Sequence, residues 1–250
     1  MGMGAGTGFT RRHRLDTAFG WSFVLLAWTV VAIGFASQVR LRFTGQSDYP
    51  APLALEVHVW AFSAWLTLLA LQVALASSGR LHWHRTVGAL GMLLVPVMAW
   101  SAIAAECYSQ RFYAPGNPEN IRFFPIPLNS VLCFVGCALA AFVYRRSPPY
   151  HKRLVCLATA VILVAAFARW WGGAIATALA PGFLAEWLSN YAGVLVLFVA
   201  AMGYDLATRG SVHPVHRVAI PVLVGMQLLA VAIGQSQAWP ELGRRLLGIG

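Results

Sequence analysis

The sequence predicts an all-α membrane protein, a polytopic bundle of seven transmembrane helices. Hydrophobic residues make up 59% of its 250 residues and charged residues only 10%, whereas a soluble domain carries about 25% charged residues. The apolar residues form seven long runs, and runs of about 18 or more residues are typical of membrane-spanning helices. These runs are too long and continuous for barrel strands, so helices satisfy the backbone hydrogen bonds in lipid.

The first two helices are predicted from the first two apolar runs and the residues before them. The run 17–39 comes after a basic segment with Arg11, Arg12 and Arg14, as in a signal peptide, but it is too long and lacks a clean cleavage site. We therefore expect a retained first helix, preceded by a disordered cytoplasmic segment over residues 1–16. The run 52–77 forms the second helix.

The remaining helices are separated by turn signals. The third, 86–106, is followed by a long loop with Pro-Gly-Asn-Pro at 115–118, and the fourth is 124–144. The pair Pro148-Pro149 predicts a rigid stop before the fifth helix, 154–176. The sixth and seventh are 186–206 and 218–237; Pro221 lies near the start of the last, where proline costs little. The seven-helix domain thus covers 17–239, and 240–250 is a short outer tail.

Loop charges predict the orientation. Eleven of the 18 basic residues lie before the first, third, fifth and seventh helices, and six lie in the other loops. The positive-inside rule places the N-terminus in the cytoplasm and the C-terminus outside. Loop arginines supply most of the net charge of +10, so this charge does not indicate nucleic-acid binding. The partners that we expect are membrane lipids; the sequence leaves the oligomeric state open.

Histidines gather at one predicted depth. Six of the seven fall on the predicted cytoplasmic side, and a His-basic pair begins four of the apolar runs. Neutral imidazole ligates zinc, copper and haem iron. The candidate metal ligands are His82, His84, His151, His213, His216 and Asp205. For two-histidine ligation of a haem, we expect His84 with His151 or His216.

Neither H-x-H nor H-x-x-H is diagnostic, and the adjacent Arg85, Lys152 and Arg217 raise the local positive potential. They suit a haem propionate, an anionic ligand or lipid headgroups. These histidines are equally compatible with ordinary interfacial residues. No C-x-x-C motif is present, so the cysteines indicate no thiolate site.

A second polar set lies within the predicted helices, where polar groups are costly and call for a reason. We expect an outward-facing ligand pocket formed by Glu56, His58, Gln72, Asn129 and Arg169. Glu56 or Glu106 is the expected ion partner of Arg169. Structural polar packing and a snorkelling arginine are the competing interpretations.

Three stretches resemble a bacterial family of polytopic membrane proteins of unknown function. They carry a His…Gln…His-Arg-x-x-Gly pattern, a His-Lys-Arg…Arg pattern, and a third motif at 204–217. The resemblance implies a multi-pass protein of the bacterial inner membrane. It also implies a common core of His58, Gln72, His84, His151 and Arg169. The arrangement is also similar to cytochrome b561-like proteins, but a di-haem site needs a second facing pair, and only His58 lies at the outer level.

Three functions remain open. The first is a membrane redox protein that binds haem b or a metal and passes electrons to a quinone or another redox partner. The second is a metal-dependent lipid hydrolase or oxygenase that uses zinc or iron, although desaturase-type histidine boxes are missing. The third is a binder, transporter or assembly factor that uses the outer pocket; no inverted repeat supports a standard transporter.

Overall fold

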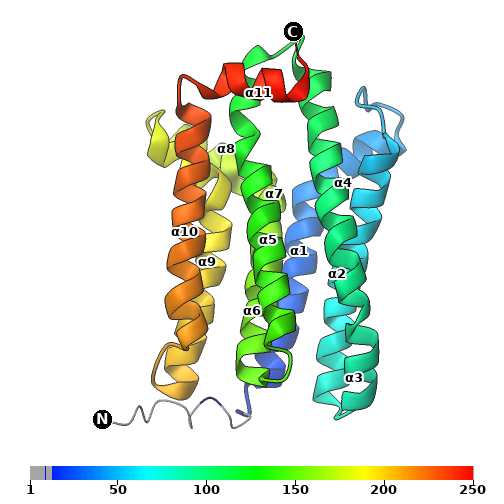
Figure 1. Ribbon diagram of the computed structural model, residues 1–250, viewed down its shortest axis with the longest axis vertical. Coiled ribbons are helices and arrows are strands. Elements are labelled where there is room, and N and C mark those ends of the chain that lie inside the picture. The colour runs from blue at the N-terminus through cyan, green and yellow to red at the C-terminus, as the bar shows by residue number, and fades with distance from the viewer. Residues whose placement is uncertain (1–8, 10–12, 250) are drawn as a thin grey trace.

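A computed structural model describes residue 9 and residues 13–249, and within these ranges all regular structure is helical. Long helices stand side by side, with the start of α1 (Asp16–Phe43) at one end of the bundle and α11 (Trp239–Leu247) at the other (Figure 1). Six helices are long and apolar enough to cross a membrane, or seven if one bent pair forms a single span. The predicted segment 1–16 lies mostly outside the described residues.

The helices follow one another with short connections. The first five are α1 (Asp16–Phe43), α2 (Leu53–Ser77), α3 (Leu81–Gly88), α4 (Leu90–Tyr113) and α5 (Pro125–Val143), with the 3-10 helix η1 (Pro118–Phe123) before α5. The bent pair consists of α6 (Pro148–Ile162), α7 (Val164–Phe167), η2 (Ala168–Gly172) and α8 (Gly173–Ala178). The chain ends with α9 (Phe183–Arg209), α10 (Pro214–Gln235) and α11 (Trp239–Leu247).

Three helices begin four or more residues earlier than the sequence predicts. The predicted helix 86–106 belongs to a span that starts at Leu81, 154–176 starts at Pro148, and 218–237 starts at Pro214. Proline is favoured at the first helical position, because its missing N–H has no partner there in any case. The pair Pro148-Pro149 therefore begins a helix instead of separating two. As a result, His82, His84, His151 and His216 lie on helices, not in loops.

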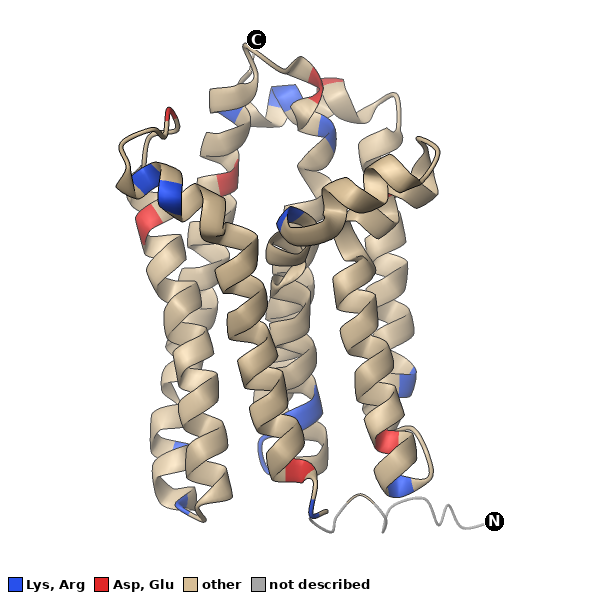
Figure 2. Cartoon of the chain, turned by 180° about the vertical axis from the view of Figure 1, so that it is seen from behind, with Lys and Arg blue, Asp and Glu red and all other residues tan. Residues whose placement is uncertain are grey.

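The two ends of the bundle differ. The histidine end is the end where α1, α3, α6 and α10 begin, and the capped end is the one crossed by α11 (Figure 1). Charged residues gather towards these ends, and the middle of the bundle is almost free of them (Figure 2). This distribution is what a membrane-spanning bundle requires, because a charge at the bilayer centre is costly.

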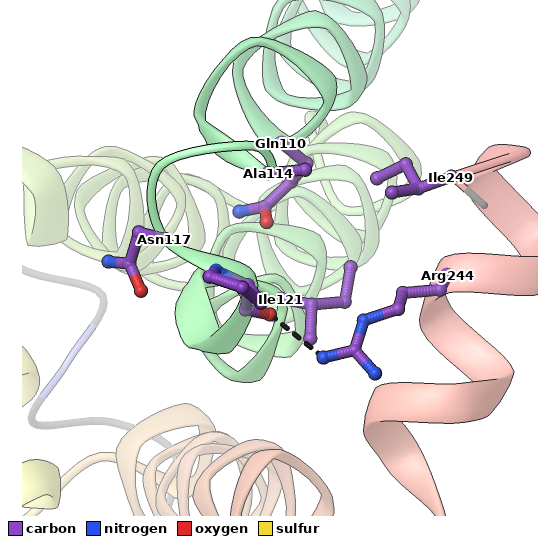
Figure 3. A pocket seen from close by; sticks show the side chains of 7 residues that line it. Gln110, Ala114, Asn117, Ile121, Arg244 and Ile249 are labelled. Atoms are coloured by element: carbon purple, nitrogen blue, oxygen red, sulfur yellow. Dashed lines mark hydrogen bonds between the residues drawn. The ribbon is translucent and has the colours of Figure 1, made fainter.

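The predicted outer tail, 240–250, is largely a helix. The Trp239 indole donates to the carbonyl of Ile121 at 2.8 Å, and Arg111 Nε donates to the carbonyl of Leu247 at 2.8 Å. Below it lies a pocket of about 130 Å³, where Arg244 donates to the carbonyl of Pro118 (Figure 3). The residues lining this pocket include no histidine, cysteine or carboxylate, so it is not a candidate metal site.

The fifth span, formed by α6–α8, bends by 42° between its halves. Its second half contains the π-helical turn Ala168–Gly172, and π-helical turns commonly redirect a helix. This turn carries Arg169 at the level of the capped end. Close contacts hold the bent half in place: a Cβ atom on Gly34 of α1 would lie 2.3 Å from the carbonyl oxygen of Ala166.

Substituting Gly34 with alanine should therefore destabilise the protein. The added methyl group meets backbone, which cannot move aside like a side chain, and such overpacking costs about 1–3 kcal/mol. Thermal unfolding in detergent measures the loss. Gly136→Ala is the matched control, because nothing lies within 4 Å of the added methyl group there. Equal unfolding temperatures for both variants would contradict the close approach of α1 and α7.

Candidate functional site

The histidine end brings the predicted histidines together in two separate groups. His84 and His151 form one group, and His213 and His216 join Asp205 in the other. His82 is exposed and packs against its neighbour Trp83. Among the described residues, no three histidine, cysteine or acidic side chains converge as a metal site. The six predicted ligands thus do not form a single centre.

His84 and His151 face each other from different helical hairpins. Their ring centres are 6.4 Å apart and their ring planes are nearly perpendicular, at 88°. His84 lies on α3, which turns back against α2, and His151 lies on α6, which turns back against α5. The two hairpins are joined in the core by the Trp65 indole, which donates to Thr159 Oγ1 at 3.1 Å. This hydrogen bond is a direct link between α2 and α6.

His151 is oriented as a ligand. Its Nδ1 lies 2.8 Å from the carbonyl oxygen of Ala141 on α5. A carbonyl only accepts, so Nδ1 donates this hydrogen bond and Nε2 is the nitrogen left for a ligand. Metal-ligating histidines almost always have such a hydrogen bond from their other nitrogen.

Gln72 controls the orientation of His84. When the Gln72 amide is oriented so that both of its ends are hydrogen-bonded, Gln72 Nε2 donates to the backbone carbonyl of His84 at 2.9 Å and to His84 Nδ1 at 2.6 Å. Gln72 Oε1 then accepts from the Gly88 amide at 3.1 Å. The proton of His84 then lies on Nε2. If His84 ligates a metal through Nε2, its Nδ1 must carry the proton. Nδ1 can then donate either to the side-chain oxygen of Gln72, once that amide is turned over, or to the backbone carbonyl of Gln72, 3.3 Å away.

The second group is a buried ion network around Asp205, which is 0% exposed. Arg153 of α6 donates to both carboxylate oxygens through Nε at 3.1 Å and also through Nη2. The backbone amide of His213 donates to the carboxylate at 3.1 Å, and His216 Nδ1 lies 2.8 Å from it. All the contacts of Asp205 thus serve to join α6, α9 and α10. His216 Nε2 is buried and has no hydrogen-bond partner in the described part of the chain.

His213 lies just before α10 and is held neutral. Its Nδ1 accepts from the Val215 amide at 3.1 Å, and its ring packs edge-on against Phe9 and Tyr150. Burial, and then the positive charge of Arg153, lower the pKa of His213 from 6.5 to about 4. A proton on Nδ1 would also break the cap of α10.

The stability of the protein should therefore fall as the pH drops from 6.5 to about 4. In this interval the unfolded histidine binds a proton that the folded one does not, so the unfolded state gains stability. Thermal unfolding at pH 8, 6 and 5 measures the slope. His213→Asn keeps an accepting side chain and should flatten the slope, whereas the exposed control His82→Asn should not. Parallel slopes in both variants would contradict a neutral His213.

The predicted outer pocket is divided between three places. Gln72 lies at the histidine end beside His84, and Glu56 is exposed. The amide of Asn129 is used inside the core, where it donates to the Tyr191 hydroxyl at 3.2 Å and accepts from Cys133. Gln72 is 16 residues from Glu56 on α2, about 24 Å at 1.5 Å per residue, so it lies towards the opposite end of that helix. Helix rotation, which the sequence does not specify, turns Glu56 and Asn129 to different surroundings.

Arg169 and His58 remain near each other. Arg169 donates to the Ala165 carbonyl on its own helix at 3.0 Å and stacks on Phe35, and it interacts electrostatically with Glu106 and His58. The expected contact ion pair is not formed with either glutamate within the described residues. Glu106 instead accepts a hydrogen bond from Gln110 at 2.7 Å.

One polar cluster was missed by the sequence reasoning. Asp16 of α1 contacts Lys152 at 3.2 Å and Arg209 at 3.0 Å, and it accepts from the Tyr204 hydroxyl at 2.5 Å. The sequence did contain a signal for this cluster. Asp16 lies at the start of the first apolar run, and Lys152 and Arg209 lie at the same predicted depth. Only the tertiary structure, in which the start of α1 reaches Lys152 of α6 and Arg209 of α9, shows that these groups meet.

Comparison with known proteins identifies no relative, because no protein-family model, curated protein or solved structure matches this chain. The function must therefore be argued from the chain's own geometry.

Proposed function

We propose that this chain is a membrane redox protein that binds haem b through His84 and His151. The observation that carries the proposal is the pair of facing imidazoles, which come from different helices at one depth. With metal–nitrogen bonds of about 2.0 Å, two imidazoles on opposite sides of one ion have ring centres roughly 6 Å apart. The observed separation is 6.4 Å.

The number of ligands supports haem over a bare ion. Zinc sites use three or four protein ligands, and the described residues offer no third histidine, cysteine or carboxylate at this pair. Haem needs only one or two axial ligands from the protein, because the porphyrin supplies the other four. For the same reason, a zinc or non-haem iron hydrolase has less support than a redox protein.

The surrounding residues have compatible roles. The carbonyl of Ala141 orients His151, and the backbone carbonyl of Gln72, 3.3 Å from His84 Nδ1, can accept the Nδ1 proton when His84 ligates through Nε2. Arg85, next to His84, is a cation suited to the propionates of haem. Bound haem would supply one-electron chemistry, with a quinone or another redox protein as the partner. The excess of basic residues at the histidine end favours a cytoplasmic position for it, in a bacterial inner membrane.

Purified protein from haem-replete cells tests the proposal. We expect near-equimolar iron and haem b by elemental analysis and by pyridine haemochrome assay, with a six-coordinate low-spin absorption spectrum. Perpendicular imidazole planes should give a strongly anisotropic low-spin electron paramagnetic resonance signal. Zinc without haem would favour the hydrolase. Protein without haem or metal, which also fails to shift the spectrum of added haemin, would overturn the proposal.

A further inference from the structure

A groove runs along the outside of the bundle between α1, α6 and α9. It encloses about 180 Å³, and its lining is almost entirely apolar. Its walls include Phe19, Phe23 and Leu26 of α1, Cys156 and Ala160 of α6, and Ala201 of α9. The groove is several times the roughly 30 Å³ that one water occupies in the liquid, and it is large enough for part of a hydrocarbon chain.

The groove ends at the polar cluster of Asp16, Lys152, Tyr204 and Arg209. Phe19, in the wall, stacks on Tyr204 at a ring-centre distance of 4.1 Å. Lys152 and Cys156 lie four residues apart on α6, one above the other on the same face. The apolar groove is therefore continuous with this polar cluster at the histidine end, which we call the charged foot of the groove.

The foot carries an excess of positive charge. Two cations, Lys152 and Arg209, share the single carboxylate of Asp16, which leaves a net charge of +1 (2 − 1). Arg14, which is exposed, adds a further positive charge two residues before Asp16. The Arg209 side chain is 4% exposed, whereas that of Lys152 is 42% exposed. Lys152 is thus the cation available to a ligand.

We propose that this groove binds one acyl chain of an anionic phospholipid, whose phosphate lies beside Lys152. The chain would fill the apolar groove, and each buried methylene would contribute through the hydrophobic effect. The excess charge of the foot favours a phosphate without a compensating ammonium. A neutral isoprenoid would gain nothing from that charge. This site does not depend on haem binding at His84 and His151.

Lipid retention by the full-length protein tests the proposal. Delipidated protein in detergent is incubated with phosphatidylglycerol or phosphatidylcholine, and bound lipid is counted by native mass spectrometry. We expect about fivefold tighter binding of phosphatidylglycerol. Lys152→Gln should remove this preference and Lys152→Arg should keep it. Arg146→Gln, in an exposed turn, is the control that should leave it unchanged.

Cys156 provides a second measurement on the unmodified chain. Phosphatidylglycerol should slow alkylation of Cys156 by N-ethylmaleimide, and it should leave Cys107, near the capped end, unaffected. Inorganic phosphate alone should not protect Cys156, because it leaves the groove empty. Equal retention of both lipids, protection by phosphate alone, or no protection of Cys156 would each overturn the proposal.

Discussion

Replacing Asp205 with alanine is expected to lower the free energy of unfolding by about 3–5 kcal/mol, the usual cost of removing one partner from a buried ion pair. Asp205 is 0% exposed and Arg153 only 4% exposed, so the guanidinium would be left without its counter-ion. The amide of His213 would also lose its acceptor. Because these contacts join α6, α9 and α10, the loss should weaken the whole histidine end.

Unfolding of the detergent-solubilised protein, by heat or denaturant, measures this loss. Glu241→Ala is the matched control: its carboxylate pairs with Arg245 at the exposed surface of α11, where ion pairs contribute about 0–1 kcal/mol. Asp205→Asn keeps the size of the side chain but not its charge, and it should fall between the two. Similar stabilities for the Asp205 and Glu241 variants would show that the network is not buried as described.

Replacing either His84 or His151 with alanine is expected to abolish six-coordinate haem binding. Each variant removes one of two axial ligands, and no other histidine among the described residues lies in position to replace it. Bound haem per protein and the low-spin absorption spectrum are the two readouts. Added imidazole should restore the spectrum in a variant that still holds haem through the remaining histidine.

His82→Ala is the matched control for this prediction. His82 lies two residues from His84 on α3, is exposed, and contacts only its neighbour Trp83 among the aromatic rings described. This variant should keep the full haem content. If both His84→Ala and His151→Ala retain the spectrum of the original protein, the facing pair is not the haem site. Loss of haem in His82→Ala as well would indicate general misfolding.

The sequence was sufficient for the fold class because bilayer insertion depends on local composition. Seven apolar runs predicted membrane-spanning helices, and the structure has six or seven, depending on how the bent α6–α8 segment is counted. The helix starts at Leu81, Pro148 and Pro214 were missed, because histidine, lysine and arginine interrupt the apolar pattern. In a membrane protein, a helix can extend past the hydrocarbon region of the bilayer, and its polar residues then lie in that extension.

The candidate site was predictable only in part. Facing histidines on different helices were expected for His84 with His151 or His216, and His151 is the one whose ring faces that of His84. His216 has the same residue type and the same depth, but helix rotation turns its Nδ1 to Asp205. Sequence spacing specifies which residues share a face of one helix, and it does not specify which neighbouring helix that face meets.

The sequence by itself determined the apolar spans, their order and the gathering of histidines near one end, because each depends on residues that are close along the chain. Only the tertiary structure decided that His84 meets His151, that Asp205 is enclosed by Arg153 and the start of α10, and that Arg169 lacks a contact ion pair among the described residues. These outcomes depend on the rotation and bending of packed helices. The rotation and bending are set by contacts between residues that are far apart in the sequence, such as the close approach of Gly34 to Ala166.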